Sequence, residues 1–568
     1  SIAFIGSPRC TTEENYLFQK IARVLFETNN VASTGAVNGQ ALIRRIEERS
    51  MGTARIAPLS RLEQADAILV INADPDHAVP VAAYHARRAA RAGTPLVTVD
   101  TRRTGLAPFA RARVRPNAGP DADARIPLLI GAIAARIAEK NGQDTGFIQQ
   151  RTTGWEAYQS GIANLLAQQP LSQAEQKAAD RAADLLAGRK IAILLGGDLM
   201  ERDSGAQTAD AAFDLALATG SLAAANGGIF IASPESNTNG AFDMGMVPDM
   251  LPGRYALSDE TARQNLERLW NARISPDPGL DLCDIIEAAE TGHIKGLYIM
   301  GENLLRTLPD ADRVEAALKN LDFLVVQDIV DTRTAKLAHV VLPGAAFAEK
   351  GGSFTNMEGR IQAFAPSTAP PGQARGDWEI LGLLAQNMGY PEQYNTVQKI
   401  RQEIRRTVPM YATLENHRRA WVKNADTGTP FDNSNSRFAF HEWQPSAAAE
   451  TDTDRPFTAL LGSLRWHLGG GTRTSRSPRI AKWHRDSQAR LCPADMESLG
   501  LAEGDTVRIA SAHGQIERPC MPDAGLVSGQ AFVPLGFSGN DAAGLADLAR
   551  LKDPDSGWRT CRVNIEKI

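Results

Sequence analysis

The sequence has few cysteines for its length, and none of them are closely spaced. Its 568 residues include five cysteines and no C-x2-C or C-x3-C pair. An iron–sulfur cluster needs four thiolates that converge on one site, usually with some of them close in sequence. We therefore expect no cluster within this chain. Scattered cysteines without a secretory signal are typical of reduced core residues. They are Cys10, Cys283, Cys492, Cys520 and Cys561.

The sequence also lacks an excess of positive charge and any long apolar run. The formal net charge is −5, so no broad basic surface for nucleic acid is expected. No apolar run approaches the roughly 20 residues that cross a bilayer. We therefore predict a cytoplasmic protein that binds no nucleic acid and that contacts a membrane only through partner subunits.

Signals for hydrolytic catalysis are missing as well. No G-x-S-x-G elbow stands on a strand-to-helix turn, and the nine histidines are scattered. His339 falls in an expected strand, where a structural hydrogen bond explains it, and His467 is interpreted as a cleft or core residue. Glu13 and Glu14 lie in the first turn of an expected helix, where the helix dipole favours acidic side chains. We predict no catalytic residue among them.

Short apolar runs alternate with helical stretches over the first two-thirds of the chain. Each run ends in Gly, Asp or Asn, and Ala-, Leu- and Arg-rich stretches lie between the runs. This alternation predicts doubly wound α/β layers, in which ligands bind at the carboxyl ends of the strands. The expected strands are Ile2–Gly6, Ala67–Asn72, Pro95–Asp100, Ile191–Gly196, Leu297–Gly301 and Leu324–Asp328, and the expected helices include Asn15–Phe26, Val81–Ala92 and Ile126–Ala138.

The composition changes near residue 445. The stretch 446–456 is polar and has no periodicity, so it is predicted to be a linker. Short strands separated by Gly-Asp and His-Gly turns follow it, which is a rhythm typical of a β-barrel. The expected barrel strands include Phe457–Leu461, Thr506–Ala510 and Gln530–Pro534.

One segment, residues 325–362, has the sequence VVQDIVDTRTAKLAHVVLPGAAFAEKGGSFTNMEGRIQ. It predicts a strand, a polar turn, a short helix, an apolar strand and a Gly-rich polar loop. Gly351 and Gly352 are expected where the backbone turns with positive φ. Short donors suited to a polyanionic or amide-rich ligand follow them. The alternative is that these side chains satisfy the backbone of the loop itself. The donors are Ser353, Thr355 and Asn356.

Further motifs occur in a fixed order along the chain. They include the stretches 5–31, 72–80, 99–110, 239–253 and 470–478. Together with residues 325–362, they resemble the molybdopterin oxidoreductase superfamily. Within it, the chain resembles formate dehydrogenase alpha subunits and the large G-type subunit of NADH:quinone oxidoreductase (complex I).

The resemblance implies a formate dehydrogenase/DMSO reductase-like α/β fold with two interleaved doubly wound domains and a C-terminal β-barrel. The first α/β domain would be discontinuous, and the barrel would follow the linker. The implied domains are 1–35 with 235–445, 36–234, the linker 446–456, and the barrel 457–568.

The resemblance also implies residues that line a pterin cofactor, molybdopterin guanine dinucleotide. The guanidinium groups of Arg473 and Arg476 suit forked contacts with phosphate. For Gly301–Asn303, a plain turn after a strand stays open as the alternative, and for the motif with the two arginines the alternative is a solvated basic loop. The lining residues would be Gly301, Glu302 and Asn303, then Ser353, Phe354 and Asn356, and finally Arg473, Thr474 and Arg476.

The chain departs from active members of the family at the metal. Those members carry a Cys or selenocysteine ligand, whereas residues 31–45 contain no Cys, selenocysteine or His. Ser33, Thr34 and Asn38 are poor ligands for a soft metal compared with a thiolate. Cys10 lies at the start of a helix, which lowers a thiol pKa, but it is interpreted as a buried structural thiol. We therefore predict no metal ligand in this chain.

Three other departures point the same way. The family's Pro-Gly-Thr-Asp element is replaced by RPNAGPDAD at 115–123, and the turn at 196–205 contains no His. The clustered cysteines of the family's N-terminal iron–sulfur domain are also not in the sequence. The resemblance therefore implies iron–sulfur clusters only in a missing N-terminal region or a partner chain.

Retained scaffold motifs beside missing metal ligands favour a non-catalytic electron-transfer subunit of a complex I-type NADH dehydrogenase assembly. Its expected partners are the iron–sulfur and flavin- or NADH-oxidising subunits of a redox complex. The alternative is the catalytic subunit of a molybdenum or tungsten bis-pterin formate dehydrogenase-like enzyme. A binding module whose cleft holds another nucleotide is a third hypothesis.

Overall fold

The computed structural model describes residues 1–37, 39–50, 57–390, 393–414, 419–422, 437–443, 452–467, 469–483, 487–537, 542–552 and 557–568. The chain forms two compact units. We call Ser1–Gln40 with Glu235–Thr427 the first unit, and Ala41–Pro234 with Gly428–Ile568 the second unit. The second unit contains both the predicted second α/β domain and the predicted barrel. The exact domain boundaries stay a prediction, and most of the predicted linker lies outside the described residues.

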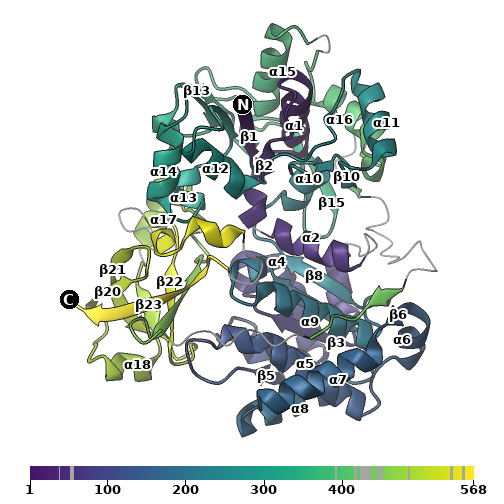
Figure 1. Cartoon of the computed structure of the whole chain (residues 1–568), viewed down its shortest axis with the longest axis vertical. Coiled ribbons are helices and arrows are strands. Elements are labelled where there is room, and N and C mark those ends of the chain that lie inside the picture. The colour runs from purple at the N-terminus through teal and green to yellow at the C-terminus, as the bar shows by residue number, and fades with distance from the viewer. Residues whose placement is uncertain are drawn as a thin grey trace. The chain divides into compact units, whose positions relative to one another are not determined.

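The first unit is built on a five-stranded parallel sheet (Figure 1). Its strand order is β13-β12-β11-β1-β2. The chain therefore runs outward from β1 to one edge and from β11 to the other, so that the direction of winding reverses between β1 and β11. The strands are β1 (Ile2–Gly6), β2 (Val31–Ser33), β11 (Gly296–Met300), β12 (Phe323–Asp328) and β13 (Val340–Pro343).

Helix α1 (Thr12–Leu25) lies in the core of the first unit, and most of its residues are buried. It begins with a capping box, in which Thr11 and Glu14 satisfy each other's backbone N–H groups. Its aromatic residues pack with strand β11 and helix α11. The other helices of this unit are α10 (Thr238–Asp243), α11 (Glu260–Trp270), α12 (Leu282–Glu290), α13 (Leu304–Thr307), α14 (Ala311–Lys319), α15 (Asp377–Asn387) and α16 (Val397–Thr407).

A small antiparallel sheet completes the first unit. Its order is β14-β15-β16, with β14 (Gly352–Thr355), β15 (Arg360–Phe364) and β16 (Arg419–Trp421). Residues 352–355 thus form a strand, where the sequence predicted a loop. Gly351 and Gly352 do not have the predicted positive φ. Gly352 is instead required by close packing, because a Cβ there would lie 2.3 Å from Cγ2 of Thr11. A hairpin, β9 (Met250–Leu251) and β10 (Tyr255–Ala256), lies nearby in sequence.

The second unit contains a second five-stranded parallel sheet, with the order β5-β4-β3-β7-β8. The direction of winding reverses between β3 and β7. Helix α5 (Ile126–Glu139) packs against both α8 (Gln173–Leu186) and α9 (Gly205–Ala218), and the three helices form the core with this sheet. The strands are β3 (Ala67–Ile71), β4 (Leu96–Val99), β5 (Ala112–Val114), β7 (Ile191–Gly196) and β8 (Gly228–Ala232).

The helices of the second unit vary in length from one turn to about four. Strand β6 (Thr152–Thr153) pairs with β17 (Phe438–Ala439), which brings residues far apart in sequence together. The helices are α2 (Gln40–Arg49), α3 (Pro75–Ala78), α4 (Pro80–Arg91), α5 (Ile126–Glu139), α6 (Thr145–Arg151), α7 (Trp155–Gln168), α8 (Gln173–Leu186) and α9 (Gly205–Ala218).

The C-terminal part of the second unit is a closed six-stranded barrel, with the order β18-β22-β19-β21-β20-β23. Alternating apolar residues fill it, as expected of a small barrel. Its strands are β18 (Phe457–Gly462), β19 (Ala489–Leu491), β20 (Thr506–Ala510), β21 (Gln515–Pro522), β22 (Gln530–Pro534) and β23 (Thr560–Lys567), with the short helices α17 (Pro478–Trp483) and α18 (Pro493–Ser498).

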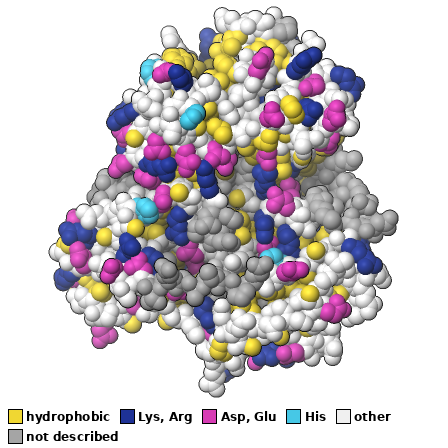
Figure 2. All heavy atoms as spheres, in the orientation of Figure 1, with side chains coloured by type: hydrophobic (Ala, Val, Ile, Leu, Met, Phe, Trp, Pro, Cys, Tyr) yellow, Lys and Arg dark blue, Asp and Glu magenta, His cyan; other side chains and the backbone are white. Residues whose placement is uncertain are grey.

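The predicted fold class, with two doubly wound α/β sheets and a C-terminal barrel, is confirmed. Each strand and helix named from the sequence is present within a few residues of its expected bounds. Within the described part of the chain, no helix combines the length and apolarity needed to cross a bilayer. Figure 2 shows acidic and basic side chains interspersed over the visible face.

Candidate functional site

A cavity of about 160 Å³ lies in the second unit, at the carboxyl ends of its parallel strands. Asp74 follows β3, Arg102 follows β4, and Asp198 follows β7, so the cavity lies where the direction of winding reverses. This is where open α/β sheets bind ligands. The barrel supplies another wall through Arg490 and Phe532.

Arginine dominates the charged lining of this cavity, and two of its arginines are already paired. Arg202 lies 3.3 Å from Asp198, and Arg559 forms an ion pair with Glu201. Burial raises the pKa of Glu201 to about 8, although Arg559 opposes that shift. For Asp198, burial would raise the pKa, but the neighbouring arginines hold it below its ordinary value.

The other arginines of the cavity keep donors for a ligand. Arg102 comes only within 4.0 Å of Asp74. Arg490 lies next to the ring of Phe532, and no ion pair joins it to a carboxylate in the described part of the chain. Guanidinium groups in this state bind phosphate oxygens through forked hydrogen bonds. The cavity therefore fits a phosphate-bearing ligand.

Two glycines allow close approach at the rim of the cavity. A Cβ at Gly197 would lie 2.5 Å from the carbonyl oxygen of Ala232, and one at Gly462 would lie 2.4 Å from Cε2 of Phe532. Both positions line the cavity. No side chain fits at either point without displacing a neighbour, so glycine keeps this wall of the cavity in place.

A buried carboxyl lies close to Arg202 of the cavity. Asp123 is almost fully buried, and neither of its oxygens has a hydrogen-bond partner among the described residues. Burial raises its pKa to about 6, while the charge of Arg202 opposes the shift. Asp123 belongs to the RPNAGPDAD element, which the sequence identified only as a departure from a family motif.

In the first unit, the predicted residues Gly301, Glu302 and Asn303 follow β11, where the direction of winding reverses. Glu302 is 1% exposed, and its carboxylate accepts four side-chain donors: Ser7 Oγ at 2.7 Å, Arg9 Nη1 at 3.0 Å, Thr34 Oγ1 at 2.7 Å and Thr307 Oγ1 at 3.0 Å. Four donors fill the acceptor sites of a carboxylate. Glu302 therefore joins the loop after β1, the turn after β2 and helix α13 of the first unit.

The two neighbours of Glu302 are also engaged by the chain itself. Gly301 has φ of +72°, and a Cβ there would lie 2.6 Å from Sγ of Cys10. Asn303 is buried, and its Oδ1 accepts a hydrogen bond from Thr334 Oγ1 at 2.9 Å. Glycine at 301 is thus required both by its backbone conformation and by the packing of Cys10.

The residues predicted from the FAEKGGSFTN motif lie on β14 and just after it. The backbone N–H and Oγ of Ser353 donate to Glu13 at 2.7 and 2.9 Å. Phe354 packs against Phe364. Oδ1 of Asn356 accepts the backbone N–H of Arg360 at 2.9 Å. Ser353 and Asn356 therefore follow the alternative interpretation, in which these side chains form hydrogen bonds within the chain.

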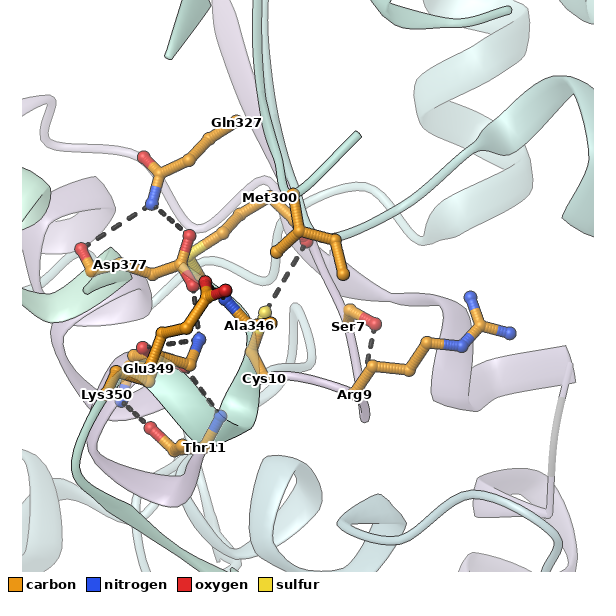
Figure 3. Close-up of polar contacts among 12 residues, drawn as sticks. Ser7, Arg9, Cys10, Thr11, Met300, Gln327, Ala346, Glu349, Lys350 and Asp377 are labelled. Carbon is orange, nitrogen blue, oxygen red and sulfur yellow. Dashed lines mark hydrogen bonds and ion pairs between the residues drawn. The ribbon is translucent and has the colours of Figure 1, made fainter. Parts of the chain in front are cut away.

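A buried ion cluster lies beside these residues (Figure 3). The ammonium group of Lys350 lies 2.8 Å from the carboxylate of Glu14 and also pairs with Asp377. Gln327 Nε2 donates to Asp377 at 2.6 Å. One ligand atom each from Cys10, Glu14 and Asp377 lie within 4.8 Å of one another, but both carboxylates already pair with Lys350.

The surroundings of the Cys10 thiol disfavour the thiolate form that would bind a metal. Burial raises its pKa well above the ordinary value, and the nearby carboxylates of Asp377 and Glu14 raise it further. Its Sγ lies 4.0 Å from the carbonyl oxygen of Met300 (Figure 3). The predicted buried structural thiol is what the structure shows. Its position at the start of α1 does not overcome the cost of burying a thiolate.

The hydroxyl groups that follow β2 are also engaged. Ser33 Oγ accepts the backbone N–H of Gly35 at 3.0 Å, and Thr34 Oγ1 donates to Glu302. Asn38, the remaining candidate, lies outside the described residues. The described residues of 31–45 therefore offer a metal neither a thiolate nor an available hydroxyl, and a protein ligand for a pterin-bound metal does not fit here.

The third predicted motif lies in the second unit, in a 3₁₀ turn (Thr474–Arg476). Thr474 Oγ1 lies 2.8 Å from Nδ1 of His467, and Nε2 of His467 lies 2.6 Å from the carbonyl oxygen of Gly536. Arg473 and Arg476 are exposed and do not line the cavity. His467 is a buried structural residue, in agreement with its interpretation from the sequence. His339 is exposed, but it has the expected structural hydrogen bond, because its Nδ1 accepts the backbone N–H of Leu324.

Family models match most of the chain. The model for Molybdopterin oxidoreductase matches residues 1–387, and the model for Molydopterin dinucleotide binding domain matches residues 457–560. The chain belongs to the molybdopterin oxidoreductase family. The second match covers the barrel wall of the cavity, including Gly462, Arg490 and Phe532.

Relatives agree with this membership, and a solved structure shares the fold. The chain is 30% identical to F420-dependent formate dehydrogenase 1 subunit alpha of Methanococcus maripaludis, over 100% of this chain and 86% of that one. It is 31% identical to F420-dependent formate dehydrogenase subunit alpha of Methanocaldococcus jannaschii, with the same coverage. Acetylene hydratase from Pelobacter acetylenicus shares the fold, with a TM-score of 0.76, 15% identity, and coverage of 100% of this chain and 86% of that one.

Sequence reasoning missed the charged residues of the cavity. None of Asp74, Arg102, Asp198, Arg202 and Arg490 was singled out, although the first three follow predicted strands. Their position just after a strand was the available signal. The predicted lining residues remain predictions, because the contacts described above are made within the chain and do not test contacts with a ligand.

Proposed function

We propose that this chain is the large subunit of a formate dehydrogenase-like molybdopterin oxidoreductase, and that its second unit holds the diphosphate part of a molybdopterin dinucleotide. The observation that carries the proposal is the arginine-lined cavity, one wall of which lies in the region matching a dinucleotide binding domain. A 160 Å³ space is close in size to cavities that take a benzene-sized molecule. It therefore suits one part of a dinucleotide.

Arg102 and Arg490 would bind the phosphates, and Gly197 and Gly462 would let the ligand approach the backbone. Such a cofactor, when bound, supplies two-electron redox chemistry at a molybdenum or tungsten ion. The electrons would pass to iron–sulfur and flavin subunits of a redox complex, and formate is the substrate that the two archaeal relatives name.

The test is to produce the full chain in a host that makes the cofactor and to analyse what it carries. We expect one or two pterins and the matching guanine nucleotide per chain after denaturation, and formate-dependent reduction of a dye. Protein that carries neither pterin nor guanine nucleotide would refute the proposal, and an Arg490→Met variant should carry less of both.

A second candidate is the non-catalytic electron-transfer subunit of a complex I-type assembly. It is favoured by the donors after β2, because Ser33 and Thr34 are bonded within the chain and Cys10 is a buried thiol. The same preparation distinguishes the two. Bound pterin dinucleotide without molybdenum or tungsten, and without formate oxidation, would favour this candidate.

A further inference from the structure

The ring of Phe532 lies next to two arginines of the cavity. The guanidinium carbon of Arg102 is 4.5 Å from the ring centroid, and that of Arg490 is 5.7 Å from it. The ring itself is 4% exposed, and all three residues line the cavity. A cation within about 6 Å of an aromatic centroid is attracted to the face of the ring.

The two arginines reach this ring from different parts of the second unit. Arg490 is the cross-strand neighbour of Phe532, from β19 to β22. Arg102 comes from the loop after β4. One barrel side chain thus fixes a cation from the barrel and a cation from the α/β sheet.

These are also the arginines that keep donors for a ligand. Arg202 and Arg559 form close ion pairs with acidic side chains, whereas the nearest ion pair of Arg102 is the 4.0 Å contact with Asp74, and its charge acts on Asp100 and Asp198 from a greater distance. An aromatic ring holds a guanidinium in place without using its N–H donors, since the contact is with the face of the guanidinium plane. Phe532 therefore orients two cations and leaves them able to donate.

Gly462 belongs to the same arrangement. It ends β18, next to Phe532 on β22, and a Cβ at this position would lie 2.4 Å from Cε2 and 3.0 Å from Cζ of the ring. Any larger residue would push the ring away from its place next to the two arginines. Glycine at 462 is thus a condition for the position of Phe532.

We propose that Phe532 is a positioning residue that holds Arg102 and Arg490 as a clamp for the diphosphate of a purine nucleotide, with Gly462 providing the space for its ring. This inference rests on the proposed function and adds to it the residue that orients the phosphate-binding groups. Phe532 touches the two arginines and acts through them.

The test uses the full chain, produced without cofactor, and GDP as the probe in calorimetric titration. Phe532→Leu keeps an apolar side chain but removes the aromatic face. We expect its Kd for GDP to rise about tenfold, since two cation–π contacts are lost. Gly462→Ala should weaken binding in the same direction, and Phe532→Tyr, which keeps the face, should restore it.

Phe537 provides a matched control in the same barrel. It stacks on His467 at 4.4 Å and lies 5.8 Å from the guanidinium of Arg518, but it does not line the cavity. Phe537→Leu should leave the Kd for GDP unchanged. A second readout is the dependence of Kd on salt concentration, which reports charge contacts. It should become shallower in Phe532→Leu and stay unchanged in Phe537→Leu.

The possible failures can be told apart. If the wild-type chain binds neither GDP nor inorganic pyrophosphate, the diphosphate site itself is refuted, and the clamp with it. If the wild-type chain binds GDP and Phe532→Leu binds it equally well with the same salt dependence, the clamp is refuted and the site stands. Equal weakening by Phe532→Leu and Phe537→Leu, with unchanged salt dependence, would show a general packing effect and would also refute the clamp.

Discussion

Replacing Glu14 by Gln should change how the stability of the chain depends on pH. Glu14 lies in the buried cluster of the first unit, in which Lys350 pairs with both Glu14 and Asp377. Burial raises its pKa from the ordinary 4.5 to about 7, and Asp377 adds to the shift, while Lys350 and the N–H of Thr11 oppose it. The net charge of the cluster also favours a protonated Glu14. One lysine neutralises one of two carboxylates, so the cluster is close to neutral when the other keeps a proton.

The sign follows from the two pKa values. Between pH 4.5 and pH 7, the native chain holds a proton on Glu14 that the unfolded chain has released. The free energy of unfolding therefore falls as the pH rises through this window, and the loss is complete above it. A shift of this size corresponds to about 3 kcal/mol. In Glu14→Gln, an amide that does not titrate replaces the carboxyl, and this part of the pH dependence disappears.

The assay is denaturant unfolding of wild type and Glu14→Gln at a series of pH values from 4.5 to 8, followed by hydrogen exchange of residues 344–356. Other buried carboxyls also have a raised pKa, including Asp243 and Asp214, so the difference between the two proteins isolates Glu14. The stability of the variant relative to wild type should rise with pH and level off above about pH 7. Parallel curves for the two proteins across this range would refute the reasoning.

Three further substitutions test the first unit. Lys350→Met should cost about 3–5 kcal/mol at neutral pH, because it leaves the buried carboxyl groups of Glu14 and Asp377 without their cation, and the loss should shrink at pH 5, where Glu14 is neutral because its pKa is raised to about 7; an equal loss at both pH values would contradict this. Gly352→Ala should cost about 1–3 kcal/mol in thermal or denaturant unfolding, because its Cβ would meet Thr11 at 2.3 Å, whereas Gly351→Ala, with its nearest neighbour at 3.7 Å, is the control and should change stability little. Thr34→Val should cost about 1–3 kcal/mol by removing a donor from the buried carboxylate of Glu302, and Thr34→Ser should retain most of the stability; a loss in Thr34→Ser without a loss in Thr34→Val would show that the methyl group, not the hydrogen bond, matters.

The alternation of apolar runs and helical stretches was enough to predict the two sheets and the barrel. Buried parallel strands such as β3 and β7 are continuous apolar runs in sequence, so they are easy to recognise. Gly352 shows where this reasoning fails. Its glycine was assigned to a positive φ, but the reason for it is a close contact with Thr11, which lies more than 300 residues away in the sequence. No local pattern contains that contact.

The same limit applies to the site. The family resemblance implied Glu302 as a lining residue in a motif at the end of a strand, and Glu302 does follow β11. The sequence does not reveal that Ser7, Arg9, Thr34 and Thr307 converge on its carboxylate. Arg490 and Phe532 were not singled out at all, because their meeting with Arg102 depends on how the barrel packs against the second sheet within its unit.

Each of the two parallel sheets has a point where the direction of winding reverses, but the charged side chains at the two points differ in how they are paired. In the first unit, the carboxylate at this point accepts four side-chain donors, and Arg9 pairs with both Glu302 and Glu235. In the second unit, Arg102 and Arg490 are oriented by a ring and keep their donors. A charge that is already paired gains little from an anionic ligand, whereas a positioned guanidinium without a close carboxylate gains charge-assisted hydrogen bonds. Binding of a phosphate-bearing ligand should therefore depend far more on Arg490 than on Arg9. Arg490→Met should weaken GDP binding strongly. Arg9→Met should lower stability, because the buried carboxylate of Glu302 loses its cation, and it should leave GDP binding unchanged; the opposite order in the same titration would show that the first unit, not the second, holds the diphosphate.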